Sequence, residues 1–191
     1  MDEFEIDLDW VGFELHPETP RGGMAVTDLF PADRVAAMRG HLQDAARRFG
    51  VEMGQPDHIP NSRRALALAE QARDGGNLQA ARNAAMDAHW LHGKNIEADD
   101  VLAEIASAAG LDTVLAVART RSPDWEARVD AMRREASAWG VSGIPTFFFL
   151  PDGWTLEGAA AWTGPSPLKV VGCQPLPLLR DAARRIGAPP R

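Results

Sequence analysis

The stretch from Gly140 to Leu150 constrains the fold of this chain more than any other. Gly140 is suited to end a helix, and the Ile144-Pro145 step leads into an apolar run from Phe147 to Leu150. Proline has no backbone N–H, so it belongs at the mouth of a strand and not inside one. Four consecutive apolar residues are typical of a strand that is covered on both faces, as in an α/β sheet. The stretch therefore predicts a helix end, a tight loop and a buried strand in immediate succession.

A second strand is predicted at residues 3–15, because apolar and acidic residues alternate there. One face carries Phe4, Ile6, Leu8 and Trp10, and the other carries Glu3, Glu5, Asp7 and Asp9. The apolar positions change parity near Val11-Gly12, which predicts a bulge at that point.

Helical spacing of apolar residues dominates the chain from 33 to 139. The first helix, 33–49, is expected to bury Val35, Met38, Leu42, Ala45, Ala46 and Phe49. Later helices are expected to begin at Asn61 or Ser62, at Asn77, at Asp99 or Asp100, at Asp112 and at Ser122-Pro123. Residues 154–169 show no clean period. A short strand at Val170-Val171 and a last helix from Pro175 to Gly187 complete one α/β domain, residues 1–191, with a helical insertion.

Composition excludes several classes of function. The net charge of −7 argues against a nucleic-acid partner or an anionic membrane surface. No apolar run approaches the about 20 residues of a membrane span. The acidic N-terminal sequence lacks the features of a signal peptide, so a cytoplasmic location is expected. Cys173 is the only cysteine, which excludes an intrachain disulfide and a dithiol motif within this sequence.

Several motifs, taken in chain order, resemble one known family. Gly140-Val-Ser-Gly-Ile-Pro-Thr-Phe-Phe-Phe resembles the cis-proline loop and following strand of DsbA-like thioredoxin-fold oxidoreductases. Four further motifs resemble the FrnE-type and 2-hydroxychromene-2-carboxylate isomerase-like branch of that family. They are Trp10-Val-Gly-Phe-Glu-Leu-His-Pro-Glu, Asn61-Ser-Arg-Arg-Ala65, Gly93-Lys-Asn-Ile-Glu with Val101-Leu-Ala-Glu-Ile-Ala, and Gly172-Cys-Gln-Pro175. The match runs through nearly the whole chain.

The resemblance implies a thioredoxin-like fold. It places a strand at 3–15, a helical insertion and following helix at 33–139, and the cis-proline loop, C-terminal strands and last helix at 144–187. Family members begin with a strand that feeds a Cys-x-x-Cys or serine motif and a helix, and this sequence starts where their second strand lies. The first strand, the nucleophile motif and the first helix are therefore expected to be absent. Either the flanking strands pair directly, or a partner chain fills the gap, or the protein begins upstream.

The resemblance also implies a substrate site at Ile144, Pro145 and Thr146. A cis proline exposes the backbone edge before it, which can pair with an extended peptide or glutathione; the alternative is a plain entry into the strand. Asn61 is a second candidate contact for a thiol ligand, although a helix cap explains it as well.

The remaining candidate residues have simpler explanations. Cys173 could form one mixed disulfide with glutathione or a partner, but we expect a small residue packed at a strand end. His89 and His92 have a chelating spacing but lack a recognisable third ligand, so no metal site is expected. Trp154 and Trp162 line a pocket, form an interface or cover a core edge, and the sequence leaves these alternatives open.

Three functional hypotheses follow. The first is a DsbA-family thiol-disulfide oxidoreductase homologue, truncated and inactive in dithiol chemistry as written. The second is a non-catalytic thioredoxin-like module that binds a peptide or partner, with a homodimer as one way to complete its sheet. The third is a glutathione-dependent isomerase or transferase; otherwise no cofactor is expected.

Overall fold

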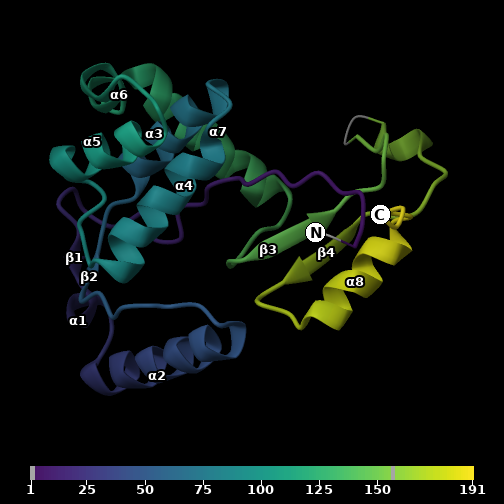
Figure 1. The fold of residues 1–191 in the computed structure, drawn as a ribbon, viewed down its shortest axis with the longest axis horizontal. Helices are drawn as coiled ribbons and strands as arrows, with labels where there is room; N and C mark the ends of the chain where they lie inside the picture. Colours follow the sequence, from purple (N-terminus) through teal and green to yellow (C-terminus); the bar gives the residue numbers. More distant parts are fainter. Residues whose placement is uncertain (1–2, 156–157) are drawn as a thin grey trace. The chain divides into compact units, whose positions relative to one another are not determined.

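The computed structural model describes residues 3–155 and 158–191 (Figure 1). The chain forms two compact units. One unit is His16–Arg134, and the other combines the N-terminal segment up to Leu15 with Glu135–Arg191. Among the described residues, no helix has both the length and the apolar character needed to cross a membrane.

The unit His16–Arg134 is mainly helical (Figure 1). Its elements are β1 (Met24–Ala25), α1 (Val26–Leu29), α2 (Ala32–Phe49), β2 (His58–Ile59), α3 (Arg63–Asp74), α4 (Leu78–Met86), a π-helical turn (Asp87–Leu91), α5 (Asp99–Ala108), α6 (Thr113–Arg119) and the larger part of α7 (Pro123–Ala138). The strands β1 and β2 form a short antiparallel pair. The predicted helices are therefore confirmed in their order and close to their predicted ends.

The core of this unit lies among α3, α4, α5 and α6. Leu68 and Leu102 are completely buried, and Ile105 is 2% exposed. Most of the other core positions are alanines, which bring the helix backbones close together. At roughly 25 cal/mol per Å² of buried apolar surface, the three large side chains stabilise the fold more than any alanine beside them.

Local side-chain chemistry sets several helix starts. The carboxylate of Asp112 accepts a hydrogen bond from the Leu115 amide at 2.9 Å, so the predicted cap of α6 is confirmed. At α3, Asn61 Oδ1 accepts from the Arg63 amide at 3.1 Å, while Ser62 makes no capping bond with its side chain. Asn77 likewise caps α4 only with its backbone carbonyl.

The predicted buried face of α2 is wrong in part. Val35 and Ala46 are buried, but Met38, Leu42 and Phe49 are 37%, 40% and 51% exposed. Helical spacing shows that one face is apolar, but it does not supply an element to cover that face.

The second unit contains a two-stranded antiparallel sheet and a helix. Its strands are β3 (Thr146–Phe149) and β4 (Leu168–Val171), with Thr146 opposite Val171 and Phe149 opposite Leu168. A 3-10 turn (Ala159–Ala161) lies between them, and α8 (Leu176–Arg185) follows. Within the irregular segment 154–169, residues 156–157 lie outside the described residues.

Two sequence predictions for this unit are corrected. The strand predicted at 3–15, with its bulge, does not form in the described residues, because a strand needs a neighbour and only Phe4 makes an isolated bridge, with Pro190. The four residues of β3 are half-buried, so β3 is not covered on both faces as predicted.

Candidate functional site

The predicted cis-proline loop connects α7 to β3. Gly140 ends the helix with φ of 67°, and the Ile144-Pro145 bond is cis, as predicted. The Pro145 carbonyl accepts a hydrogen bond from the Gly172 amide at 2.8 Å, and Thr146 Oγ1 donates to the Gly143 carbonyl at 2.7 Å. These bonds fix the loop to the beginning of the β3–β4 ladder.

Ile144 is the accessible part of this loop. Its exposed fraction is 53%, and neither its amide nor its carbonyl makes a backbone hydrogen bond within the described residues. β3 also pairs on one edge alone within the described part of the chain, with β4. Backbone donors and acceptors in such positions can pair with an added extended segment.

An aromatic cluster lies where α7 ends and the loop begins. Trp139, near the end of α7, packs edge-on against Phe148 and Trp154, with ring centroids 4.9 and 5.6 Å apart. The ammonium of Lys169 donates to the carbonyls of Gly140 and Trp139 and lies 5.8 Å from the Phe148 ring. A cation at a helix C-terminus complements the unpaired carbonyls and the helix dipole.

The aromatic cluster accounts for Trp154, one of the two tryptophans whose role the sequence left open. Trp154 packs within it, whereas the Trp162 indole donates to the Pro165 carbonyl at 2.7 Å inside its own turn.

Cys173 lies in the turn between β4 and α8 and is exposed. The expectation that it is packed at the strand end is therefore wrong. The Gln174 side chain holds this turn by donating to the Val171 carbonyl at 2.8 Å, which leaves the thiol at the surface.

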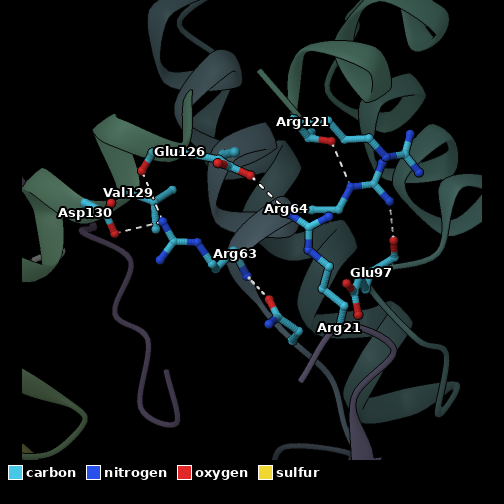
Figure 2. A pocket seen from close by; sticks show the side chains of 11 residues that line it. Arg21, Arg63, Arg64, Glu97, Arg121, Glu126, Val129 and Asp130 are labelled. Carbon is cyan, nitrogen blue, oxygen red and sulfur yellow. Dashed lines mark hydrogen bonds and ion pairs between the residues drawn. The ribbon is translucent and has the colours of Figure 1, made fainter. Parts of the chain in front are cut away.

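Asn61 belongs to the helical unit and has structural partners there. Its Nδ2 donates to the Thr19 carbonyl at 2.7 Å, while its Oδ1 caps α3. The side chain thus ties the loop that contains Thr19 to the first turn of the helix. Asn61 also lines a cavity of about 490 Å³, shown in Figure 2.

We call this cavity the arginine pocket, because four arginines of the described residues line it together with three carboxylates. Its lining is Arg21, Asn61, Arg63, Arg64, Ala67, Glu97, Thr120, Arg121, Glu126, Val129 and Asp130. These residues come from the loop before β1, the start of α3, the α4–α5 connection, the end of α6 and α7, so the packing of the helical unit builds the pocket.

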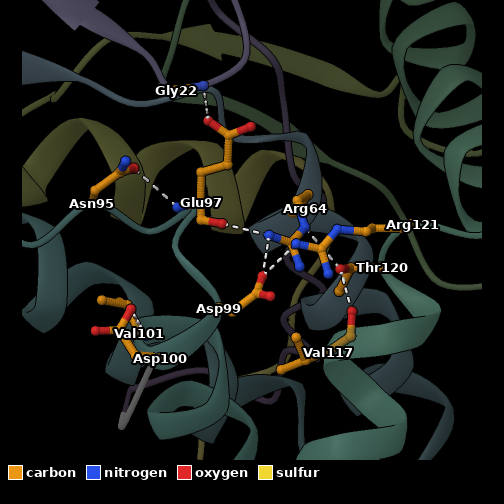
Figure 3. Close-up of polar contacts among 10 residues, drawn as sticks. All are labelled: Gly22, Arg64, Asn95, Glu97, Asp99, Asp100, Val101, Val117, Thr120 and Arg121. Carbon is orange, nitrogen blue, oxygen red and sulfur yellow. Dashed lines mark hydrogen bonds and ion pairs between the residues drawn. The ribbon is translucent and has the colours of Figure 1, made fainter.

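Ion pairs organise the walls of the arginine pocket. Arg63 donates to Asp130 at 2.8 Å (Figure 2), and Arg64 and Arg121 both contact Asp99, at 2.6 and 2.7 Å (Figure 3). The hydrogen bond from Arg63 lowers the pKa of Asp130, and those from Arg121 and then Arg64 lower the pKa of Asp99. Both carboxylates are therefore ionised at neutral pH.

The sequence prediction did not find this pocket. One signal was available: Arg63 and Arg64 stand in the first turn of a helix, where the dipole disfavours cations. Two consecutive arginines at that position need compensating acidic groups or an anion nearby.

The two histidines considered as metal ligands differ in environment. His89 lies in the π-helical turn, where burial and then the charge of His58 lower its pKa, and His92 is exposed. Within the described residues, no group of three or more potential ligand side chains is placed to hold a metal ion.

Comparison with known proteins assigns the family. A family model described as DSBA-like thioredoxin domain matches residues 2–182. The chain belongs to this family. The predicted DsbA-family resemblance and thioredoxin-like fold with a helical insertion are thereby confirmed, while the narrower FrnE-type branch stays a prediction.

A solved structure supports the fold of this DSBA-like domain. The structure described as a probable DsbA oxidoreductase from Streptomyces coelicolor matches with a TM-score of 0.74 and 23% identity, covering 93% of this chain and 74% of that chain. At this identity the likeness shows the fold alone. A search of curated proteins found no match.

Proposed function

We propose that this DSBA-like domain binds an extended peptide that carries a thiol or disulfide, at Ile144, Pro145, Thr146 and the neighbouring edge of β3. The observation that carries the proposal is Ile144, which is 53% exposed and whose amide and carbonyl make no backbone hydrogen bond within the described residues. Membership of the DSBA-like family supports the class of substrate.

The domain does not carry out dithiol chemistry alone in this proposal. Dithiol exchange within one chain needs two cysteines, and this sequence has one, Cys173. In this proposal the domain recognises a DsbA-type substrate and carries out no dithiol exchange within its own sequence.

A binding experiment tests the proposal directly. The probe is a short unstructured peptide with one cysteine, used reduced and as its mixed disulfide with glutathione. Hydrogen exchange should show new protection of the Ile144 amide and of β3 in the presence of peptide, and an insulin-reduction assay should show no activity. Equal protection by free glutathione would favour a glutathione-dependent enzyme instead.

Substitutions make the test specific. Ile144→Asp should raise the peptide Kd by about tenfold or more, since it places a charge at an apolar contact. Leu176→Asp is the matched control, because Leu176 has nearly the same exposure in the same unit, 54% against 53%. An equal loss of affinity in both variants, or no saturable binding by the parent protein, would contradict the proposed site. If light scattering shows a dimer that peptide cannot displace, and the β3 amides are already protected from exchange without peptide, the β3 edge serves a second copy and the peptide proposal fails.

A further inference from the structure

We infer that α2 is the docking surface for an amphipathic helix of a partner protein, with acidic residues beside its apolar stripe. The surface, which we call the α2 seam, consists of Met38, Leu42, Ala45 and Phe49. It belongs to the unit His16–Arg134 and is separate from the proposed peptide site, which lies in the other unit. Three observations support the inference: the spacing of the seam, its exposure and the charge of the row beside it.

The apolar residues of α2 follow a heptad repeat. Val35, Met38, Leu42, Ala45 and Phe49 occupy alternating a and d positions, which is the pattern of a helix that packs along one other helix. A helix that packs on the core of its own domain carries a wider apolar stripe, which includes e or g positions. In α2 the e and g positions hold mainly basic residues or histidine. The spacing therefore favours contact with a single further helix.

The α2 seam is open in the described part of the chain. Met38, Leu42 and Phe49 are 37%, 40% and 51% exposed. In Figure 1, α2 lies apart from the bundle of α3, α4, α5 and α6, which forms the core of the same unit. Three large apolar side chains on one stripe at i, i+4 and i+11 are the kind of anchors that helix-in-groove contacts use.

A neighbouring segment already holds α2 in place. Gln43 donates to the Met53 carbonyl at 2.9 Å, and Arg39 donates to the Pro56 carbonyl at 3.3 Å. These bonds run along one flank of α2, beside the seam and not across it. A partner helix would therefore bind a surface that is already ordered, which lowers the entropic cost of association.

The other flank of the seam is basic. Arg34, His41 and Arg48 recur at every seventh position and so form one row along the helix. Neither Arg34 nor Arg48 makes an ion pair within the described residues. The acidic residues of α2, Asp33 and Asp44, lie on the face away from the seam. Acidic side chains at the flanking positions of a partner helix would pair with this row.

Charge disfavours two other occupants of the seam. A second copy of α2 in antiparallel contact would bring Arg34 to Arg48, and in parallel contact it would bring Arg34 to Arg39, so like charges meet in both orientations. An anionic lipid surface would face the net charge of −7 of the whole chain. A partner helix contacts only the seam and its basic row, so it gains the local attraction with little of this repulsion.

A designed peptide tests the inference because it carries only the proposed chemistry. It has about three heptads, with leucine at a and d and glutamate at e and g, and its like charges keep it from pairing with itself. A second peptide has lysine in place of each glutamate. The glutamate peptide should bind saturably, about tenfold or more tightly than the lysine peptide, and more weakly as salt is raised. Its binding should change the amide chemical shifts of α2.

Two matched pairs of variants locate the contact, with circular dichroism to show that each is folded. Leu42→Asp should raise the Kd of the glutamate peptide by about tenfold or more, whereas Leu115→Asp should not change it. Leu115 lies on α6 of the same unit and has a similar exposure, 47% against 40%. Arg48→Gln should raise the Kd by about threefold or more. Arg47→Gln removes the same charge one residue away, where the side chain pairs with Asp44, and should not change the Kd.

Several results would overturn the inference. No saturable binding of the glutamate peptide up to about 1 mM, or equal binding of both peptides, would remove the proposed partner chemistry. An equal loss of affinity in Leu115→Asp or Arg47→Gln would place the contact elsewhere or reduce it to net charge. A dimer that Leu42→Asp dissociates would assign the seam to a second copy, and flotation of the parent with phosphatidylglycerol vesicles would assign it to a lipid surface. None of these measurements depends on the peptide site at Ile144, so the two proposals fail separately.

Discussion

Replacing Glu70 with glutamine should remove about 2–3 kcal/mol from the free energy of unfolding. The Glu70 carboxylate is 7% exposed and joins two arginines, Arg73 on its own helix and Arg128 on α7. Arg73 Nε lies 3.0 and 3.1 Å from its two oxygens, and Arg128 donates from Nε and Nη2 at 3.1 and 3.0 Å. Breaking a buried ion pair costs more than this, but both arginines keep some solvent contact, with side chains 26% and 34% exposed.

Arg128 retains a second partner, Asp74, in the Glu70→Gln variant, and this partner limits the loss in the free energy of unfolding. Its guanidinium donates twice to Asp74, at 2.9 Å each, and lies 5.1 Å from the Trp125 ring centroid. Asp74, and after it Glu70, raises the pKa of Arg128, so the arginine stays charged in the variant. A double-mutant cycle with Arg128→Met should give a Glu70–Arg128 coupling of about 1–2 kcal/mol.

Urea denaturation followed by circular dichroism, with hydrogen exchange of the α3 and α7 amides, measures these energies. Asp74→Asn is the matched control: Asp74 contacts the same arginine but is 54% exposed, so its substitution should cost about 1 kcal/mol or less. If Glu70→Gln stays within about 0.5 kcal/mol of the parent, the buried carboxylate does not stabilise the contact between α3 and α7.

Three further predictions concern the same unit. Leu102→Ala should cost about 2–5 kcal/mol in urea denaturation, because Leu102 is completely buried; a smaller loss would mean that the alanine-rich core collapses onto the cavity. Gly54→Ala should lower stability by about 1–3 kcal/mol, since its Cβ would lie 2.6 Å from the Trp90 carbonyl oxygen, and an unchanged Tm would contradict this contact. Burial, and then the charge of His58, lowers the pKa of His89 below 6.5, so the unfolded chain takes up the proton first. As pH falls below 6.5 the parent should lose stability relative to His89→Asn, whereas above pH 7 the difference between them should be constant; parallel curves throughout would refute the shift.

Features that depend on a few neighbouring residues could be predicted from the sequence. The start of α6 at Asp112 and the end of α2 at Gly50, which has φ of 64°, are set by local capping chemistry. The loop at Ile144-Pro145 followed from a motif confined to eleven residues. The order of the helices therefore required no knowledge of their packing.

Features that depend on a distant partner could not be predicted in the same way. The alternation at residues 3–15 records which side chains would share a face, but a ladder needs a second strand at the right distance. The apolar positions Met38, Leu42 and Phe49 likewise define a face of α2 without showing what covers it. The exposed position of Cys173 depends on the turn after β4, which periodicity does not describe.

The arginine pocket depends on long-range packing, but one sign of it is visible in the local sequence at the start of α3. Arg63 and Arg64 occupy the end of α3 where a helix favours acidic side chains, so the local cost must be offset by groups from elsewhere. Asp130 offsets it for Arg63 at 2.8 Å, because α7 packs beside α3. Arg64 shares Asp99 with Arg121 and still has a buried nitrogen without a partner in the described residues. Of the two arginines, Arg64 is therefore the one whose position the packing of the helices explains less completely.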